Sequence, residues 1–64
     1  MRVVNIEEVL KYIQDRDDVS FDDILDHFGA ETNENRARLR NKVCRLVRQG
    51  YLVKTGPNSW RTAA

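Results

Sequence analysis

The side chains best suited to a chemical task are the basic and amide groups that recur between residues 36 and 48. They are Arg36, Arg38, Asn41, Lys42, Arg45 and Arg48. Guanidinium and ammonium groups bind phosphates, and arginine and asparagine also form paired hydrogen bonds with base edges. These residue types therefore support recognition of a polyanion rather than the making or breaking of covalent bonds.

Helical spacing would gather most of these side chains on one surface. At about 100° per residue, Leu39, Leu46 and Val47 lie within about 60° of Val43 and form an apolar face. Four side chains lie about 140–160° from Val43 on the same helix. We call this set the basic stripe; it consists of Arg38, Asn41, Arg45 and Arg48. Lys42 flanks it, and we expect the crowded cations to face an anionic partner.

The distribution of charge along the chain favours the same interpretation. Residues 1–31 carry three basic and nine acidic side chains, a net charge of −6, whereas residues 32–64 carry eight basic and one acidic, a net charge of +7. Such asymmetry is typical of a protein whose basic side meets a polyanion. Two alternatives stay open, namely a basic helix that is merely solvated and one that pairs with the acidic half. A solvated helix usually mixes both signs, whereas this segment is poor in acidic residues.

Other reactive residues form no catalytic or metal-binding pattern. Cys44 is the single cysteine and His27 the single histidine, so neither an internal disulfide nor a cysteine-based zinc site is expected. We expect Cys44 to be small and partly buried, with a reactive thiol or an intermolecular disulfide as the alternative, and His27 to lie on the surface. The aspartates between residues 15 and 26 lack the pattern of a calcium loop. We therefore predict no enzymatic activity, no cofactor and no bound metal.

Local signals predict the elements that must position the stripe. Asn5 and Ser20 are good N-caps, each with an acidic residue three positions later. Helices are therefore expected over about residues 6–15 and over about eight residues after Ser20. Gly29 ends the second helix, and we expect at most a one- or two-residue strand at Val19.

The C-terminal half predicts a long helix followed by a hairpin. The helix is expected to begin between Thr32 and Asn35 and to end at Gln49. Strands are expected over Leu52–Thr55 and Trp60–Thr62, with turn residues between them. A lone hairpin is marginal in water, so the first residue of each strand is expected to anchor it on the helices.

This arrangement resembles the winged helix-turn-helix family. The resemblance is carried by the short helix between Phe21 and Phe28, the turn at Gly29, and the run from Arg36 to Lys54, in which a basic helix leads through a glycine into a strand. It covers nearly the whole chain. It implies one α+β domain over residues 1–64, a three-helix bundle with a C-terminal β-hairpin wing, that binds double-stranded DNA as a small transcriptional regulator.

The resemblance implies a role for each candidate side chain. The third helix would enter the major groove, where Arg38 and Asn41, near its N-terminal end, are expected to contact base edges. Phosphate contacts are expected from Lys42, Arg45, Arg48 and Arg36. The hairpin of this family often reaches the minor groove or the backbone, which implies DNA contacts by Lys54, Asn58 and Arg61.

The segment Gly56–Arg61 also resembles the wing of Z-alpha domains, which are winged helices that bind left-handed nucleic acid. The asparagine and tyrosine that this family carries on its recognition helix are replaced here by Arg40 and Cys44. Z-form binding is therefore a minor alternative, in which Trp60 contacts nucleic acid. Otherwise Trp60 fills the gap between the hairpin and the helices.

Two further functions stay open. A protein–protein adaptor would use the acidic N-terminal half, and self-association would use the first helix with Val3 and Tyr12. Binding of structured or single-stranded RNA would need Tyr51 and Trp60 as stacking aromatics. No segment predicts a membrane span or a signal peptide. We expect a cytoplasmic, nucleoid-associated protein, or a nuclear one in a eukaryote, with no small-molecule substrate.

Overall fold

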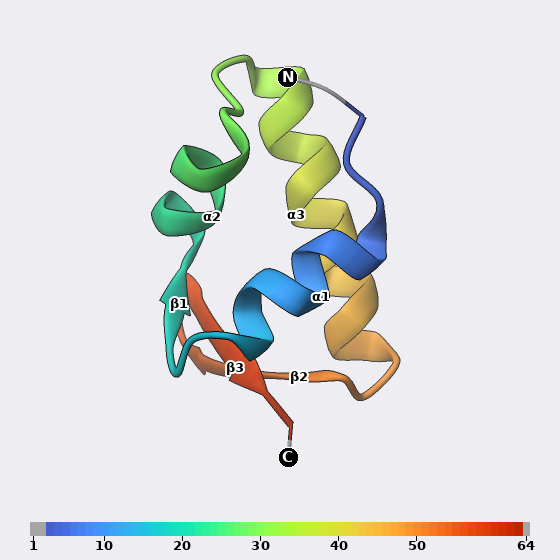
Figure 1. Cartoon of the computed structure of the whole chain (residues 1–64), viewed down its shortest axis with the longest axis vertical. Helices are drawn as coiled ribbons and strands as arrows, with labels where there is room; N and C mark the ends of the chain where they lie inside the picture. Colours follow the sequence, from blue (N-terminus) through green and yellow to red (C-terminus); the bar gives the residue numbers. More distant parts are fainter. Residues whose placement is uncertain (1–2, 64) are drawn as a thin grey trace.

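The computed structural model describes residues 3–63, which form three helices and a three-stranded antiparallel sheet (Figure 1). The elements in chain order are α1 (Ile6–Gln14), β1 (Val19–Ser20), α2 (Phe21–Phe28), α3 (Asn33–Arg48), β2 (Leu52–Gly56) and β3 (Ser59–Thr62). The predicted α+β class is confirmed at this level.

The helices begin where their capping residues indicate. Asn5 caps α1 and Ser20 caps α2, and each side chain accepts a backbone N–H at 3.1 Å from the acidic residue three positions later. Those acidic residues, Glu8 and Asp23, bond back to the cap backbone and complete two capping boxes. Thr32 caps α3 in a similar way, which places the start of that helix at the early end of the predicted interval.

Two helix ends carry a residue with positive φ. Gly29, directly after α2, has a φ of 69°, and Gly50, beyond α3, has a φ of 86°. Glycine adopts this left-handed conformation without the clash that a Cβ would introduce. The helix α1 ends at Gln14, one residue earlier than predicted, because Asp15 is its C-cap.

The sheet has the order β1-β3-β2, so the last strand lies in its centre. The predicted short strand is confirmed, since Val19 pairs with Trp60. The hairpin turn is tighter than predicted and consists of Pro57 and Asn58, because the residues on either side of them belong to β2 and β3 and pair with each other.

The core lies between the helices and one face of the sheet. Leu52 and Trp60 are both 3% exposed and anchor the hairpin as predicted. On α2, Phe21 and Ile24 are buried, while Leu25 and Phe28 are half-buried against the same core. Phe21 is buried because its ring packs edge-on against Trp60, with centroids 6.1 Å apart.

Among residues 3–63, no helix has the length and apolar character needed to cross a bilayer.

Candidate functional site

The helix α3 is anchored by three side chains on one face and presents the basic stripe on the other. Leu39, Val43 and Leu46 are buried, as predicted, and Val47 is half-buried. All four stripe residues are exposed. From Arg38 to the last of them the stripe extends about 15 Å along the helix axis at 1.5 Å per residue.

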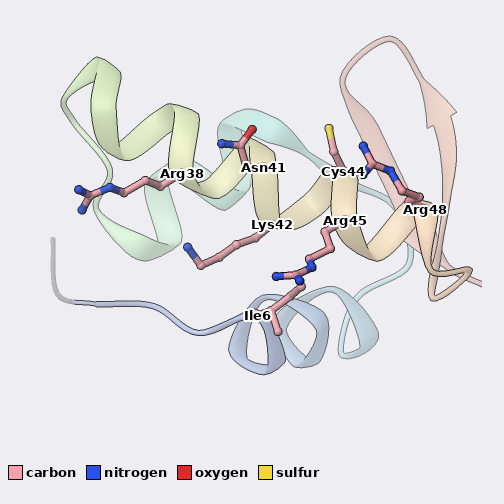
Figure 2. Close-up of a pocket in the computed structure, with 7 residues that line it drawn as sticks. All are labelled: Ile6, Arg38, Asn41, Lys42, Cys44, Arg45 and Arg48. Atoms are coloured by element: carbon pink, nitrogen blue, oxygen red, sulfur yellow. The ribbon is translucent and has the colours of Figure 1, made fainter.

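The stripe borders a surface depression of about 690 Å³ between α3 and α1 (Figure 2). The lining residues are Ile6, Arg38, Asn41, Lys42, Cys44, Arg45 and Arg48. Arg45 points toward Ile6, the first residue of α1, and Lys42 lies on the same side of α3, whereas Asn41 and Cys44 lie on the opposite flank of the helix. The structure thus gathers five of the six predicted α3 side chains around one concave, cationic surface.

The sixth side chain, Arg36, lies outside that depression. It is exposed in the first turn of α3, ahead of Leu39, the first residue of this helix to be buried. The structure therefore leaves it at the N-terminal margin of the stripe.

Arg38 is the stripe residue with an internal ionic partner. Its Nη2 donates to Oε1 of Glu34, one turn earlier on α3, and both side chains are largely exposed. Within residues 3–63, no cation of α3 pairs with a carboxylate of α2. Among these residues, the structure therefore records no ion pair of the kind that pairing of the basic helix with the acidic second helix would require.

The three predicted hairpin residues are not equivalent. Lys54 is exposed and lies opposite Trp60, on the same face of the sheet. Arg61 is exposed and pairs with Val53, so the alternation of side chains along a strand places it on the face opposite to Trp60. Asn58 lies in the turn, where its Oδ1 accepts a hydrogen bond at 3.2 Å from Arg40 Nη2.

Arg40 is the residue of this surface that sequence reasoning missed. Its guanidinium carbon lies 4.3 Å from the centroid of the Phe21 ring, in addition to its bond to Asn58. On the helix it lies about 60° from Val43, between the apolar face and the stripe, so periodicity assigns it to neither. The bond to Asn58 joins positions 18 residues apart, which no local pattern reveals.

One expectation about a single residue is wrong and another is confirmed. Cys44 is exposed rather than partly buried, because it lies beyond the edge of the apolar face of α3. Trp60 is buried and fills the gap between the hairpin and the helices, as predicted, so its ring has no free face for the base stacking that the Z-form and RNA alternatives invoke. Tyr51 is 52% exposed and keeps an accessible ring.

His27 is exposed, as predicted, and stacks on Tyr12 with ring centroids 4.0 Å apart. Tyr12 is half-buried, because its ring also contacts the edge of Phe28 and lies 4.6 Å, measured from its centroid, from the guanidinium carbon of Arg16. Among residues 3–63, no cluster of three or more histidine, cysteine, aspartate or glutamate side chains is placed to hold a metal ion.

Comparisons with known proteins do not extend this description. No protein-family model matches the chain, and neither curated protein sequences nor solved structures match it. The functional interpretation therefore depends on the residues and geometry described above.

Proposed function

We propose that this chain is a winged helix domain that binds double-stranded DNA with α3 and the hairpin. The element order, helix–strand–helix–helix–strand–strand, with the first short strand paired to the last, is the order that the resemblance implies. In this interpretation α2 and α3 form the helix-turn-helix, α3 is the recognition helix, and β2 with β3 forms the wing.

The observation that carries the proposal is the exposed basic stripe on α3, opposite its buried face. A duplex offers a row of phosphates on either side of a major groove about 12 Å wide, which admits an α-helix. Each cation that meets a phosphate releases condensed counterions, which favours binding and makes it depend on salt. The stripe has the sign, the exposure and the linear arrangement that such a surface requires.

Positions along α3 suggest how the contacts are divided. Arg38 and Asn41 lie toward the N-terminal end, where a recognition helix meets base edges, and both side chains can make paired hydrogen bonds there. The cations nearer the C-terminal end of α3 bind phosphates at the edge of the major groove; they are Lys42, Arg45 and Arg48. A small regulator of transcription would act by occupying such a site.

The test is fluorescence anisotropy with a random duplex of about 20 base pairs, titrated at several salt concentrations. Four to five phosphate contacts predict a slope of about −4 for log K against log salt. The double variant Arg38→Ala/Arg45→Ala should bind more weakly and with a flatter slope. The matched control is Lys11→Ala/Arg16→Ala, which removes two exposed cations outside the stripe and should leave the slope unchanged.

Absence of binding at low salt by the wild-type protein would refute the proposal. The adaptor alternative would then lead, with the acidic residues of α1 and α2 as the surface for a protein partner. If the double variant and its control lost the same amount of affinity for the duplex, binding would depend on the total charge of the protein and not on the basic stripe.

A further inference from the structure

The hairpin turn is held in place by two different helices through one residue. The backbone carbonyl of Asn58 accepts a hydrogen bond from the N–H of Phe21, the first residue of α2, at 2.7 Å. Its side-chain Oδ1 accepts from Arg40, in the middle of α3, at 3.2 Å. The position of the turn relative to α3 is therefore set by direct bonds, and not only by the strands that lead to it.

Arg40 is itself held by two contacts. Its guanidinium lies over the ring of Phe21, whose edge packs on the buried Trp60. A guanidinium uses its face for such stacking and keeps its five N–H donors in the plane. One nitrogen is bonded to Asn58, and the side chain as a whole remains exposed, so donors remain at its edge for a ligand.

Asn58 adds donors beside those of Arg40. A guanidinium can only donate, so the amide must direct its oxygen to Arg40, which leaves its NH2 group for another partner. Within residues 3–63, no acidic side chain pairs with Arg40 or bonds to this amide. Two held side chains thus present several donors and a positive charge at one exposed place between α3 and the turn.

We propose that Arg40 and Asn58 together bind one phosphate of the duplex backbone on the hairpin side of α3. This inference rests on the proposed function and adds a contact that the stripe does not contain. It also reassigns the hairpin's role, because Arg61 lies on the outer face of the sheet, away from Trp60, while the Arg40–Asn58 pair lies where α3 and the turn meet. Since both residues are already ordered, little side-chain entropy is lost when the phosphate binds.

The test compares three variants in the same salt titration. Arg40→Gln should lower the magnitude of the log K against log salt slope by about one, and weaken binding to all sequences alike. Lys11→Gln removes one exposed charge from α1, outside α3 and the hairpin, and should leave both quantities at the wild-type value. Asn58→Asp keeps an acceptor for Arg40 but places a carboxylate against the phosphate, so it should weaken binding while the melting temperature is retained or raised.

The outcomes separate this inference from the proposed function. If the wild-type protein shows no salt-dependent binding, both fail. If the wild type binds through the stripe but Arg40→Gln binds like Lys11→Gln, only the phosphate site is refuted. If circular dichroism shows that Arg40→Gln does not fold, the binding of Asn58→Asp becomes the test. Wild-type affinity of folded Asn58→Asp would overturn the phosphate site, and weakened binding of folded Asn58→Asp would support it.

Discussion

At the scale of the residue, the cations of the basic stripe differ in their partners, because Arg38 forms an ion pair with a glutamate of the same helix. Glu34 bonds to Arg38 across one helical turn, and both side chains are largely exposed. An exposed pair at this spacing contributes only about 0.3–0.5 kcal/mol to stability. Its larger consequence is for binding: Glu34 orients the guanidinium and places a negative charge near the phosphates.

Replacing Glu34 by glutamine should therefore separate affinity from specificity. Glu34→Gln should bind random duplex more tightly than the wild type, because a repelling charge is gone. It should discriminate less among sequences, because Arg38 loses the partner that aligns it with a base edge. Selection from a random duplex library, followed by anisotropy on the enriched and random duplexes, measures both.

The control for this experiment is Glu31→Gln, which removes an exposed acid just before α3. It should change affinity through charge alone and leave the selected bases as they are. Selection of the same bases, with equal preference, by Glu34→Gln and by the wild type would contradict an orienting role for Glu34.

At the scale of the element, the helix boundaries were predictable and the contacts between elements were not. Asn5 and Ser20 act through backbone groups three residues away, so the signal is contained in a short segment. Arg40 and Asn58, in contrast, meet across 18 positions, and Phe21 is buried by a tryptophan 39 positions later. Helical periodicity identifies which face of α3 is exposed, but it does not reveal which residues contact a side chain at the edge of that face, such as Arg40.

The turn after α2 gives a prediction at this scale. Gly29 has a φ of 69°, and a Cβ built there would meet no atom within 4 Å. The cost of Gly29→Ala is therefore one of backbone conformation and not of contact, and should be about 1 kcal/mol in the free energy of unfolding. Asparagine tolerates this conformation better, so Gly29→Asn should cost less.

Urea denaturation followed by circular dichroism measures the difference. A domain of this length has a total stability of roughly 3–10 kcal/mol, so the change should be readily visible. Because Gly29 lies outside the stripe, the affinity of the folded Gly29→Ala protein for duplex DNA should be unchanged. A stability equal to that of the wild type, or a larger loss for asparagine than for alanine, would show that the left-handed turn does not limit this position.

At the scale of the whole molecule, charge is divided unevenly between the two halves of the sequence, although α3 packs against both α1 and α2. Residues 1–31, which include α1 and α2, carry a net charge of −6, and residues 32–64, which include α3 and the hairpin, carry +7. Among residues 3–63, no ion pair joins α2 to α3, so the charges of these two helices are not neutralised by direct pairing. The acidic region should orient the molecule during approach to a polyanion, with α3 foremost.

A ligand that binds only the folded state must also stabilise it, and this links the stripe to the stability of the entire domain. Duplex present at about 100 times its Kd adds about 2.7 kcal/mol. For a domain of about 60 residues, each kcal/mol raises the Tm by about 4–8 °C, so a rise of roughly 10–20 °C is expected. Differential scanning calorimetry at low salt measures this rise in Tm.

Because binding depends on counterion release, the rise in Tm should disappear at high salt. It should also be smaller in Arg38→Ala/Arg45→Ala, whose own Tm stays close to that of the wild type because both side chains are exposed on the face opposite the core. An equal rise in this variant would mean that DNA stabilises the fold through some surface other than the stripe.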